Sequence, residues 1–200
     1  MIPVSLAVQI EEYAATLPEG TPIRATALRT LGARAALDQA LARLAREHRL
    51  LRIGRGLYVA PVATRFGVQS PYAARVVEQL SRISGEVIVP NGAVSANALR
   101  LTQQVPMQLG FLTSGSTRTL RIGPETVVLR KAQAWELAAP GSVVGEVVRA
   151  LAWIGEHGVE AALEQLKARI TPQERQQVCL VSAAGPAWLS MAITRAFAVG

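Results

Sequence analysis

The segment Ala33–Pro61 constrains the fold most, because it joins an amphipathic helix directly to a tight hairpin. Apolar residues recur in it at helical spacings of four and three: Leu37, Leu41 and Leu44. This spacing predicts a helix from Ala33 to about Arg49 with one apolar face, on which His48 is expected as a core or boundary residue. Two β-prone runs, Leu50–Ile53 and Leu57–Val59, then flank Gly54-Arg55-Gly56. Glycine adopts positive φ without steric cost, so this tripeptide predicts the turn of a hairpin.

The preceding residues extend this pattern towards the N-terminus. Residues 5–16 have helical apolar spacing, and Pro18-Glu19-Gly20 ends that helix. Thr21-Pro22-Ile23 is short and extended, and residues 25–31 predict a two-turn helix that Gly32 stops. The order is helix, short strand, helix, turn, helix and hairpin, which predicts a winged helix-turn-helix domain over residues 1–66.

The second part of the chain predicts a mixed domain over residues 71–200, after a linker at 61–70. Helices are expected from Ser70 to about Ser84 and over 93–100, with a short strand at 86–89 between them. Three β-prone runs predict a small antiparallel meander: Met107–Thr113, Thr117–Ile122 and Thr126–Lys131. A helical C-terminal part follows Pro140-Gly141. In it Thr171-Pro172-Gln173-Glu174 forms a capping box, and residues 176–194 are interpreted as a buried helix. The predicted fold class is therefore α+β.

Positive charge is concentrated near the N-terminus. The chain has a net charge of +7, and residues 24–65 contain nine arginines but only two acids, Asp38 and Glu47. Such a basic cluster is typical of a module that binds a polyanion. An arginine-rich composition would explain why the chain has only two lysines, but it would not explain the clustering.

The residue inventory argues against an enzyme and against a metal or cofactor. Asp38 is the one aspartate, whereas Mg²⁺-assisted phosphoryl transfer generally needs two or three converging carboxylates. One cysteine, Cys179, and two distant histidines, His48 and His157, do not make a zinc site. A single cysteine also suits a reducing compartment, and no secretory signal or membrane-spanning run is present, so a cytoplasmic protein is expected.

The outward face of the predicted recognition helix presents groups that suit duplex DNA. Gln39 can bond adenine and Arg43 can bond guanine, with Arg34 at the border of the same face. Three further arginines are expected to contact phosphates: Arg24, Arg29 and Arg46. In the hairpin, Arg55 is expected to enter the minor groove or contact its phosphates, and Arg52, in the strand before it, is a further expected DNA contact. The alternatives are a winged-helix module that docks a protein without binding DNA and, less favoured, an RNA-binding module.

Two stretches carry a resemblance to a known family. "ALDQALARLAREHRLLRIGRGLYVAP" is similar to the winged-helix domain of AbiEi-type antitoxins from abortive-infection (type IV) toxin–antitoxin systems. "IVPNGAVSANALRLTQQVP" and "FLTSGSTRTLRIGPETVVLRK" resemble the C-terminal region of a short branch of that family, so that the resemblance covers about residues 5–135.

The resemblance implies a repressor that binds operator DNA, expected to be an inverted repeat, and counters a nucleotidyltransferase toxin without necessarily binding it. It also places an antitoxic surface loosely on six residues: Asn97, Arg100, Gln104, Arg118, Arg121 and Lys131. Asn97 and Gln104 fit capping and turn roles better than a surface role.

Overall fold

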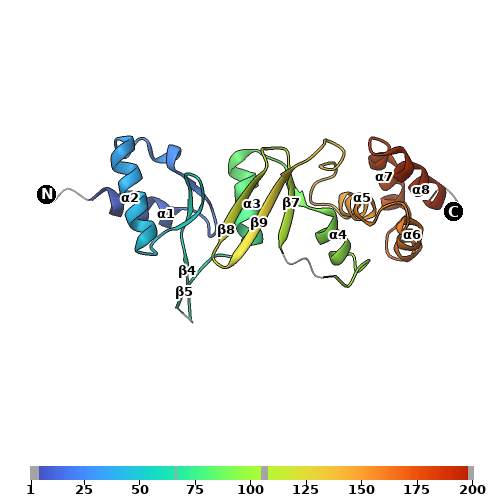
Figure 1. Ribbon diagram of the computed structural model, residues 1–200, viewed down its shortest axis with the longest axis horizontal. Helices are drawn as coiled ribbons and strands as arrows, with labels where there is room; N and C mark the ends of the chain where they lie inside the picture. Colours follow the sequence, from blue (N-terminus) through green and yellow to red (C-terminus); the bar gives the residue numbers. More distant parts are fainter. Residues whose placement is uncertain (1–4, 66, 105–107, 198–200) are drawn as a thin grey trace. The chain divides into compact units, whose positions relative to one another are not determined.

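The computed structural model describes residues 5–65, 67–104 and 108–197, and within them the chain is α+β, as predicted (Figure 1). Contacts divide the chain into two compact units. Unit 1 comprises Met1–Gly85 and Thr119–Val127, and unit 2 comprises Glu86–Arg118 and Val128–Gly200. The first boundary therefore follows Gly85, whereas the sequence predicted a division between residues 66 and 71.

The first half of unit 1 has the predicted order of elements but not every predicted length. It contains α1 (Leu6–Thr16), β1 (Ile23–Arg24), the 3₁₀ helix η1 (Ala25–Leu28), α2 (Arg34–Arg46), β2 (Leu51–Gly54) and β3 (Leu57–Val59). The three strands form an antiparallel sheet in the order β1-β3-β2. The predicted two-turn helix over residues 25–31 is wrong in length, because the helical part is a short 3₁₀ helix that ends at Leu28.

The core of this half forms as the apolar spacing predicts. Leu37, Leu41 and Leu44 are all buried, in one cluster with Ile10 of α1 and Leu28 of η1. The helix ends at Arg46 rather than near Arg49, and the prediction of a core or boundary role for His48 is wrong. His48 is exposed beyond the helix, with φ of 55°.

The rest of unit 1 departs from the predicted linker. Strands β4 (Val62–Thr64) and β5 (Gly67–Gln69) pair in antiparallel fashion. Helix α3 (Ala73–Ser84) starts after Tyr72, three residues later than the predicted start at Ser70. The helix ends at Gly85, which has a left-handed φ of 68°. Glycine suits this position because residues with a side chain rarely adopt that conformation.

A four-stranded sheet follows, with a strand order that the sequence did not predict. It contains β6 (Ile88–Pro90), β7 (Leu109–Thr113), β8 (Arg118–Ile122) and β9 (Glu125–Lys131), in the order β6-β7-β9-β8. The predicted meander is therefore wrong, because β9 lies between β7 and β8. The predicted start at Met107 lies outside the described residues. Helix α4 (Gly92–Ala98) begins at Asn91, whose side chain accepts a hydrogen bond from the backbone N–H of Val94 at 2.9 Å.

The C-terminal part of unit 2 is helical, as predicted. It consists of α5 (Val143–Ile154), α6 (Val159–Lys167), α7 (Pro172–Ser182) and α8 (Ala187–Phe197) around a shared apolar core. The capping box of Thr171 and Glu174 is confirmed. The single buried helix over residues 176–194 is wrong: a turn separates α7 from α8, and Leu180 and Met191 are exposed. Within the described residues, every helix is too short or too polar to cross a membrane.

Candidate nucleic-acid interface

The solvent face of α2 gathers three of the predicted DNA contacts. Gln39, Arg43 and Arg46 line one shallow groove of about 570 Å³, whose other wall is the start of α1 at Ser5–Ala7. They lie together because spacings of three and four residues return to one side of a helix. The opposite side of α2 is committed to the core, so this face is the side of the helix open to a partner.

Two of the predicted base-contacting arginines lie beside acids of the same helix. Nε of Arg34 is 3.7 Å from Asp38, and Nε of Arg43 is 3.8 Å from Glu47, each pair at a spacing of four residues. All four side chains are well exposed, so these ion pairs are weak and readily exchanged. Arg34 does not line the groove that contains Gln39 and Arg43.

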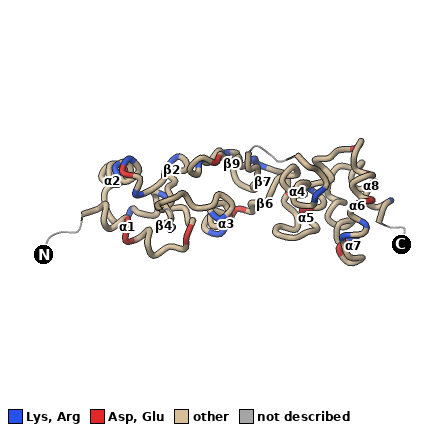
Figure 2. Tube along the Cα trace, turned by 90° about the horizontal axis from the view of Figure 1, so that it is seen from below, with Lys and Arg blue, Asp and Glu red and all other residues tan. Residues whose placement is uncertain are grey.

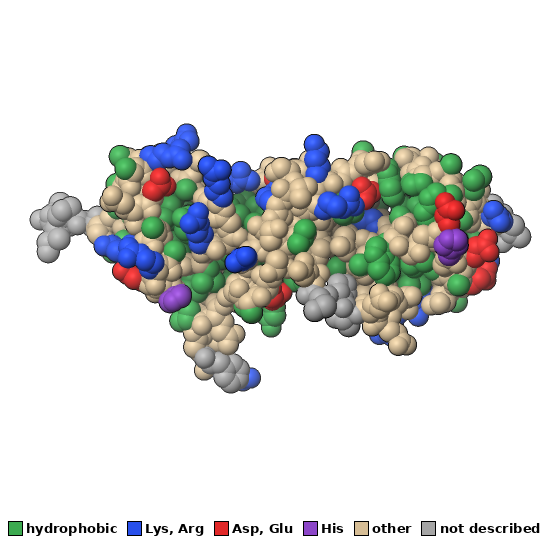
Figure 3. Space-filling model, viewed as in Figure 1, with side chains coloured by type: hydrophobic (Ala, Val, Ile, Leu, Met, Phe, Trp, Pro, Cys, Tyr) green, Lys and Arg blue, Asp and Glu red, His purple; other side chains and the backbone are tan. Residues whose placement is uncertain are grey.

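Four other predicted contacts are exposed arginines without an acidic partner among the described residues: Arg24, Arg29, Arg46 and Arg55. Basic positions of α2 and β2 are visible in Figure 2, and basic side chains gather over this part of the chain in Figure 3. Arg55 lies at the hairpin tip, where Gly56 has φ of 62°. The carbonyl of Gly56 accepts a hydrogen bond from the N–H of Ala25, which holds the tip against the start of η1.

Arg52 belongs to a second basic hollow within unit 1. It lines a space of about 410 Å³ together with Ile53, Gly54, Thr119 and Arg121. The strands approach closely here: Cδ2 of Leu120 lies 3.4 Å from where a Cβ on Gly54 would be. The structure thus brings Arg121, which the sequence grouped with an antitoxic surface, beside the hairpin arginine Arg52.

The other members of the predicted antitoxic surface belong to unit 2, and several have local partners. Nδ2 of Asn97 donates to the carbonyl of Gln104 at 3.1 Å, closing the loop after α4. Arg118 forms an ion pair with Glu86 at 2.7 Å. Arg100 and Lys131 are exposed. Asn97 and Gln104 therefore make the kind of loop contact that the sequence favoured for them.

Arg49 is a basic residue with a structural role. Its guanidinium forms ion pairs with Glu11 of α1 and with Glu47, the residue that follows α2. This connects the first helix to the end of α2. Within the described parts of the chain, His, Cys, Asp and Glu side chains form no group of three or more that could hold a metal ion.

The fold and this surface define an α+β protein with an exposed arginine-rich N-terminal unit. Residues 9–178 match the family of unknown function designated DUF6088, and the chain belongs to that family. A comparison with curated proteins gives no match. Among solved structures, the chain is similar to the RV2827C protein from Mycobacterium tuberculosis at 13% identity and a TM-score of 0.54. That likeness covers 98% of this chain and 77% of the other, and it shows a shared fold.

Proposed function

We propose that the protein is a DNA-binding transcriptional repressor of antitoxin type. Unit 1 binds operator DNA as a winged helix-turn-helix, and unit 2 counters a nucleotidyltransferase toxin. The observation that supports DNA binding best is the common exposed face of Gln39, Arg43 and Arg46 on α2. The toxin-countering role is supported by the resemblance of residues 88–131 to the C-terminal region of AbiEi-type antitoxins.

The chemistry of this face suits a base-reading helix. An α-helix fits the major groove of B-DNA, where arginine bonds guanine and glutamine bonds adenine in bidentate fashion. The α2 side of the groove has no aromatic side chain and no large apolar one, and Leu6 on the α1 side is its one large apolar residue, whereas protein-docking surfaces are enriched in aromatic anchors. We therefore favour DNA over a protein as the partner of α2.

The hairpin and its neighbours supply contacts to the DNA backbone in this proposal. Arg24, Arg29 and Arg55 are exposed cations without acidic partners in the described chain, as phosphate contacts require. Arg121 joins this group because it shares a hollow with Arg52. Phosphate contacts fix the position of the protein on the duplex, while α2 distinguishes sequences.

The experiment is a fluorescence-anisotropy titration of the full chain against duplex DNA from the region upstream of its own reading frame. Six neutralised phosphates predict a slope of about −5 in log K against log salt concentration. Arg46→Ala should weaken binding and reduce the slope by about one. Arg195→Ala is the matched control, because Arg195 is also an exposed arginine in the last turn of a helix, but in unit 2. A nearly flat salt dependence would contradict DNA binding.

A second pair of variants separates base contacts from backbone contacts. Arg43→Ala should cost about 1–3 kcal/mol of binding free energy and relax the preference at one base position. Arg55→Ala should weaken binding to every duplex about equally, since a phosphate contact carries no sequence information. The measurement is affinity across a set of single-base variants of the operator. Wild-type affinity in both variants would show that α2 and the hairpin tip are not the DNA-binding surfaces.

The antitoxin role has its own test, which does not depend on DNA binding. If the adjacent gene encodes a nucleotidyltransferase, its expression alone should arrest growth, and co-expression of this chain should restore it. A variant carrying both Arg43→Ala and Arg46→Ala should still restore growth when both genes are expressed from an unrelated promoter. Continued arrest in the presence of the wild-type chain would contradict the antitoxin role.

A further inference from the structure

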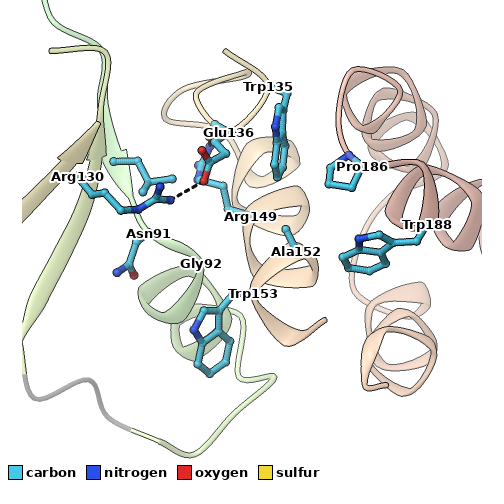
Figure 4. Close-up of a pocket in the computed structure, with 11 residues that line it drawn as sticks. Asn91, Gly92, Arg130, Trp135, Glu136, Arg149, Ala152, Trp153, Pro186 and Trp188 are labelled. Carbon is cyan, nitrogen blue, oxygen red and sulfur yellow. Dashed lines mark hydrogen bonds and ion pairs between the residues drawn. The ribbon is translucent and has the colours of Figure 1, made fainter. Parts of the chain in front are cut away.

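Unit 2 contains a cavity of about 390 Å³ whose walls include all three tryptophans of the chain, Trp135, Trp153 and Trp188 (Figure 4). The walls come from the starts of α4 and α8, the ends of β7 and β9, the loop after β9, and α5. Gly92 permits the close crossing of α4 and α5, because a Cβ there would lie 2.5 Å from the carbonyl oxygen of Arg149. The DNA-binding proposal makes no use of this cavity.

Arg149 of α5 lines the cavity and is only 3% exposed. Its Nη1 donates to the carbonyl oxygens of Glu136 and Ala138, both at 3.3 Å. Its Nε and Nη2 are buried and have no hydrogen-bond partner within the described chain. Burial lowers the pKa of Arg149, although the charge of Glu146 opposes that shift. A buried guanidinium with unpaired donors is costly unless an anion or another acceptor meets them.

The unpaired edge of Arg149 has a specific chemistry. Nε–H and Nη2–H point in parallel from one side of the guanidinium, and this fork matches the two oxygens of a carboxylate or phosphate. The nearby carboxylate of Glu136 is already engaged: it forms an ion pair with Arg130 at 2.6 Å and accepts from the N–H of Gln133 at 2.9 Å. The Glu136 carboxylate is thus not a partner of Nε and Nη2 of Arg149, which leaves these two donors for an incoming anion.

The tryptophans add flat apolar surface to this charged site. Nε1 of Trp135 donates to the side chain of Gln133 at 2.9 Å, and the Trp135 ring lies against Gly185, 3.3 Å from where a Cβ would be. Trp153 is 46% exposed, so part of its ring is accessible. Figure 4 shows Trp135 and Trp188 beside α5 and Pro186, with Trp153 next to Gly92. Indole rings bind other planar rings by stacking or edge contacts.

We propose that this cavity binds a small aromatic anion, a planar ring that carries a phosphate or carboxylate group. The fork of Arg149 holds the anionic group, and the tryptophans hold the ring. Because Nε and Nη2 are covered from solvent, a lining side chain must shift when the ligand enters. Arg130 can make this shift, because its side chain is 56% exposed. Its described partners are the Glu136 carboxylate and, through a 3.5 Å hydrogen bond, the carbonyl of Lys131.

Tryptophan fluorescence gives a direct test, because all three tryptophans line the cavity. The full chain is titrated with adenosine 5′-monophosphate and, separately, with benzoate. Adenosine and inorganic phosphate serve as controls that lack the anion or the ring. At least one aromatic anion should change the emission saturably and raise the melting temperature, whereas neither control should do so at equal concentration. The anion that binds identifies phosphate or carboxylate as the preferred group, and no saturable change with either one overturns the proposal.

Variants at Arg149 test the assigned contact. Arg149→Met removes the charge and keeps an extended side chain, and Arg149→Lys keeps the charge but removes the fork. Both should weaken binding of the aromatic anion about tenfold or more. Arg195→Ala, which changes an exposed arginine outside the cavity, should bind as the wild type does. Melting curves without ligand identify any variant that does not fold, and unchanged affinity in a folded Arg149 variant overturns the proposal.

Discussion

The arginines of unit 1 differ in whether an acidic side chain already forms an ion pair with them. Arg49 is fixed by Glu11 and Glu47, whereas Arg46 and Arg55 meet no acid among the described residues. Arg43 lies between these cases, because its exposed partner Glu47 is 3.8 Å away. A phosphate can displace a surface carboxylate at little cost, but the carboxylate still repels the DNA backbone.

Substitution of Asp38 measures how much a carboxylate beside an arginine weakens DNA binding. Asp38→Asn removes the one aspartate of the chain and releases Arg34, so affinity for any duplex should rise a few-fold at low salt and less at high salt. Anisotropy titrations at two salt concentrations measure the effect. Glu164→Gln is the matched control, since Glu164 is an exposed acid that pairs with Lys167 in α6 of unit 2. Weaker binding by Asp38→Asn would contradict the proposed role of α2.

The sequence could predict which residues share the outer side of α2, because helical spacing alone determines that. It could not place Arg121 beside Arg52, since this contact joins strands almost 70 residues apart and depends on the sheet arrangement. It also did not find the unpaired edge of Arg149, which lay unnoticed among the apolar residues of the α5 pattern. The signal that could have revealed it is a helix that is apolar on nearly every side, in which a lone arginine is buried even opposite the main apolar face.

Among the secondary structure elements, the end of α2 shows how backbone geometry overrides a sequence pattern. His48 continues the four-residue spacing of the leucines, but the helix stops before it. The carbonyl of Leu44 accepts hydrogen bonds from the N–H groups of both Arg49 and Leu50, at 2.9 and 3.1 Å. This closure turns the chain into β2 and requires the positive φ that His48 adopts.

Replacing His48 with glycine should therefore stabilise unit 1. The left-handed conformation costs a non-glycine residue about 1–2 kcal/mol, and the greater entropy of unfolded glycine offsets part of that gain. We expect His48→Gly to raise the free energy of unfolding by about 0.5–1 kcal/mol, measured by urea denaturation followed by circular dichroism. His48→Ala, which retains a Cβ, should not show the gain. A destabilised glycine variant would show that the His48 side chain makes a contribution larger than the backbone cost.

Elements with a strong local signal could be predicted, and those set by tertiary context could not. The leucine spacing of α2, the glycine turn after β2 and the capping box of α7 each specify their element through neighbouring residues. The hairpin of β4 and β5 was missed because residues 61–70 have a composition typical of a linker. The position of β9 between β7 and β8 was missed because strand order depends on long-range pairing, which leaves no local pattern.

For the molecule as a whole, the main feature is that unit 1 is built from two separate stretches of chain. Thr119–Val127 belongs to it although it follows 33 residues of unit 2. Leu120 and Ile122 of this stretch are 2% and 1% exposed, and Leu120 packs against Gly54 of the hairpin. The predicted domain of residues 1–66 therefore omits part of the unit that contains the proposed DNA-binding surface.

Leu120→Ala tests this dependence. Truncating a buried leucine costs about 2–5 kcal/mol, so unit 1 should be destabilised by about that amount. All three tyrosines of the chain lie in unit 1 and all three tryptophans lie in unit 2, so near-ultraviolet circular dichroism in urea is compared with tryptophan fluorescence, and the transition that fluorescence does not follow reports the tyrosines of unit 1. Leu180→Ala, at a site that is 76% exposed in unit 2, should change stability little. A tyrosine transition unchanged in Leu120→Ala would show that residues 119–127 are dispensable for unit 1.

The divided construction of unit 1 also sets an order of events during synthesis. When only residues 1–85 have left the ribosome, Leu120 and Ile122 are not yet available to pack against them. The apolar side chains of unit 1 that these two residues cover therefore remain exposed to solvent. The proposed DNA-binding surface can reach its full stability only after residue 127 has left the exit tunnel. A nascent chain that has not yet released this stretch therefore leaves unit 1 incompletely folded and open to proteases.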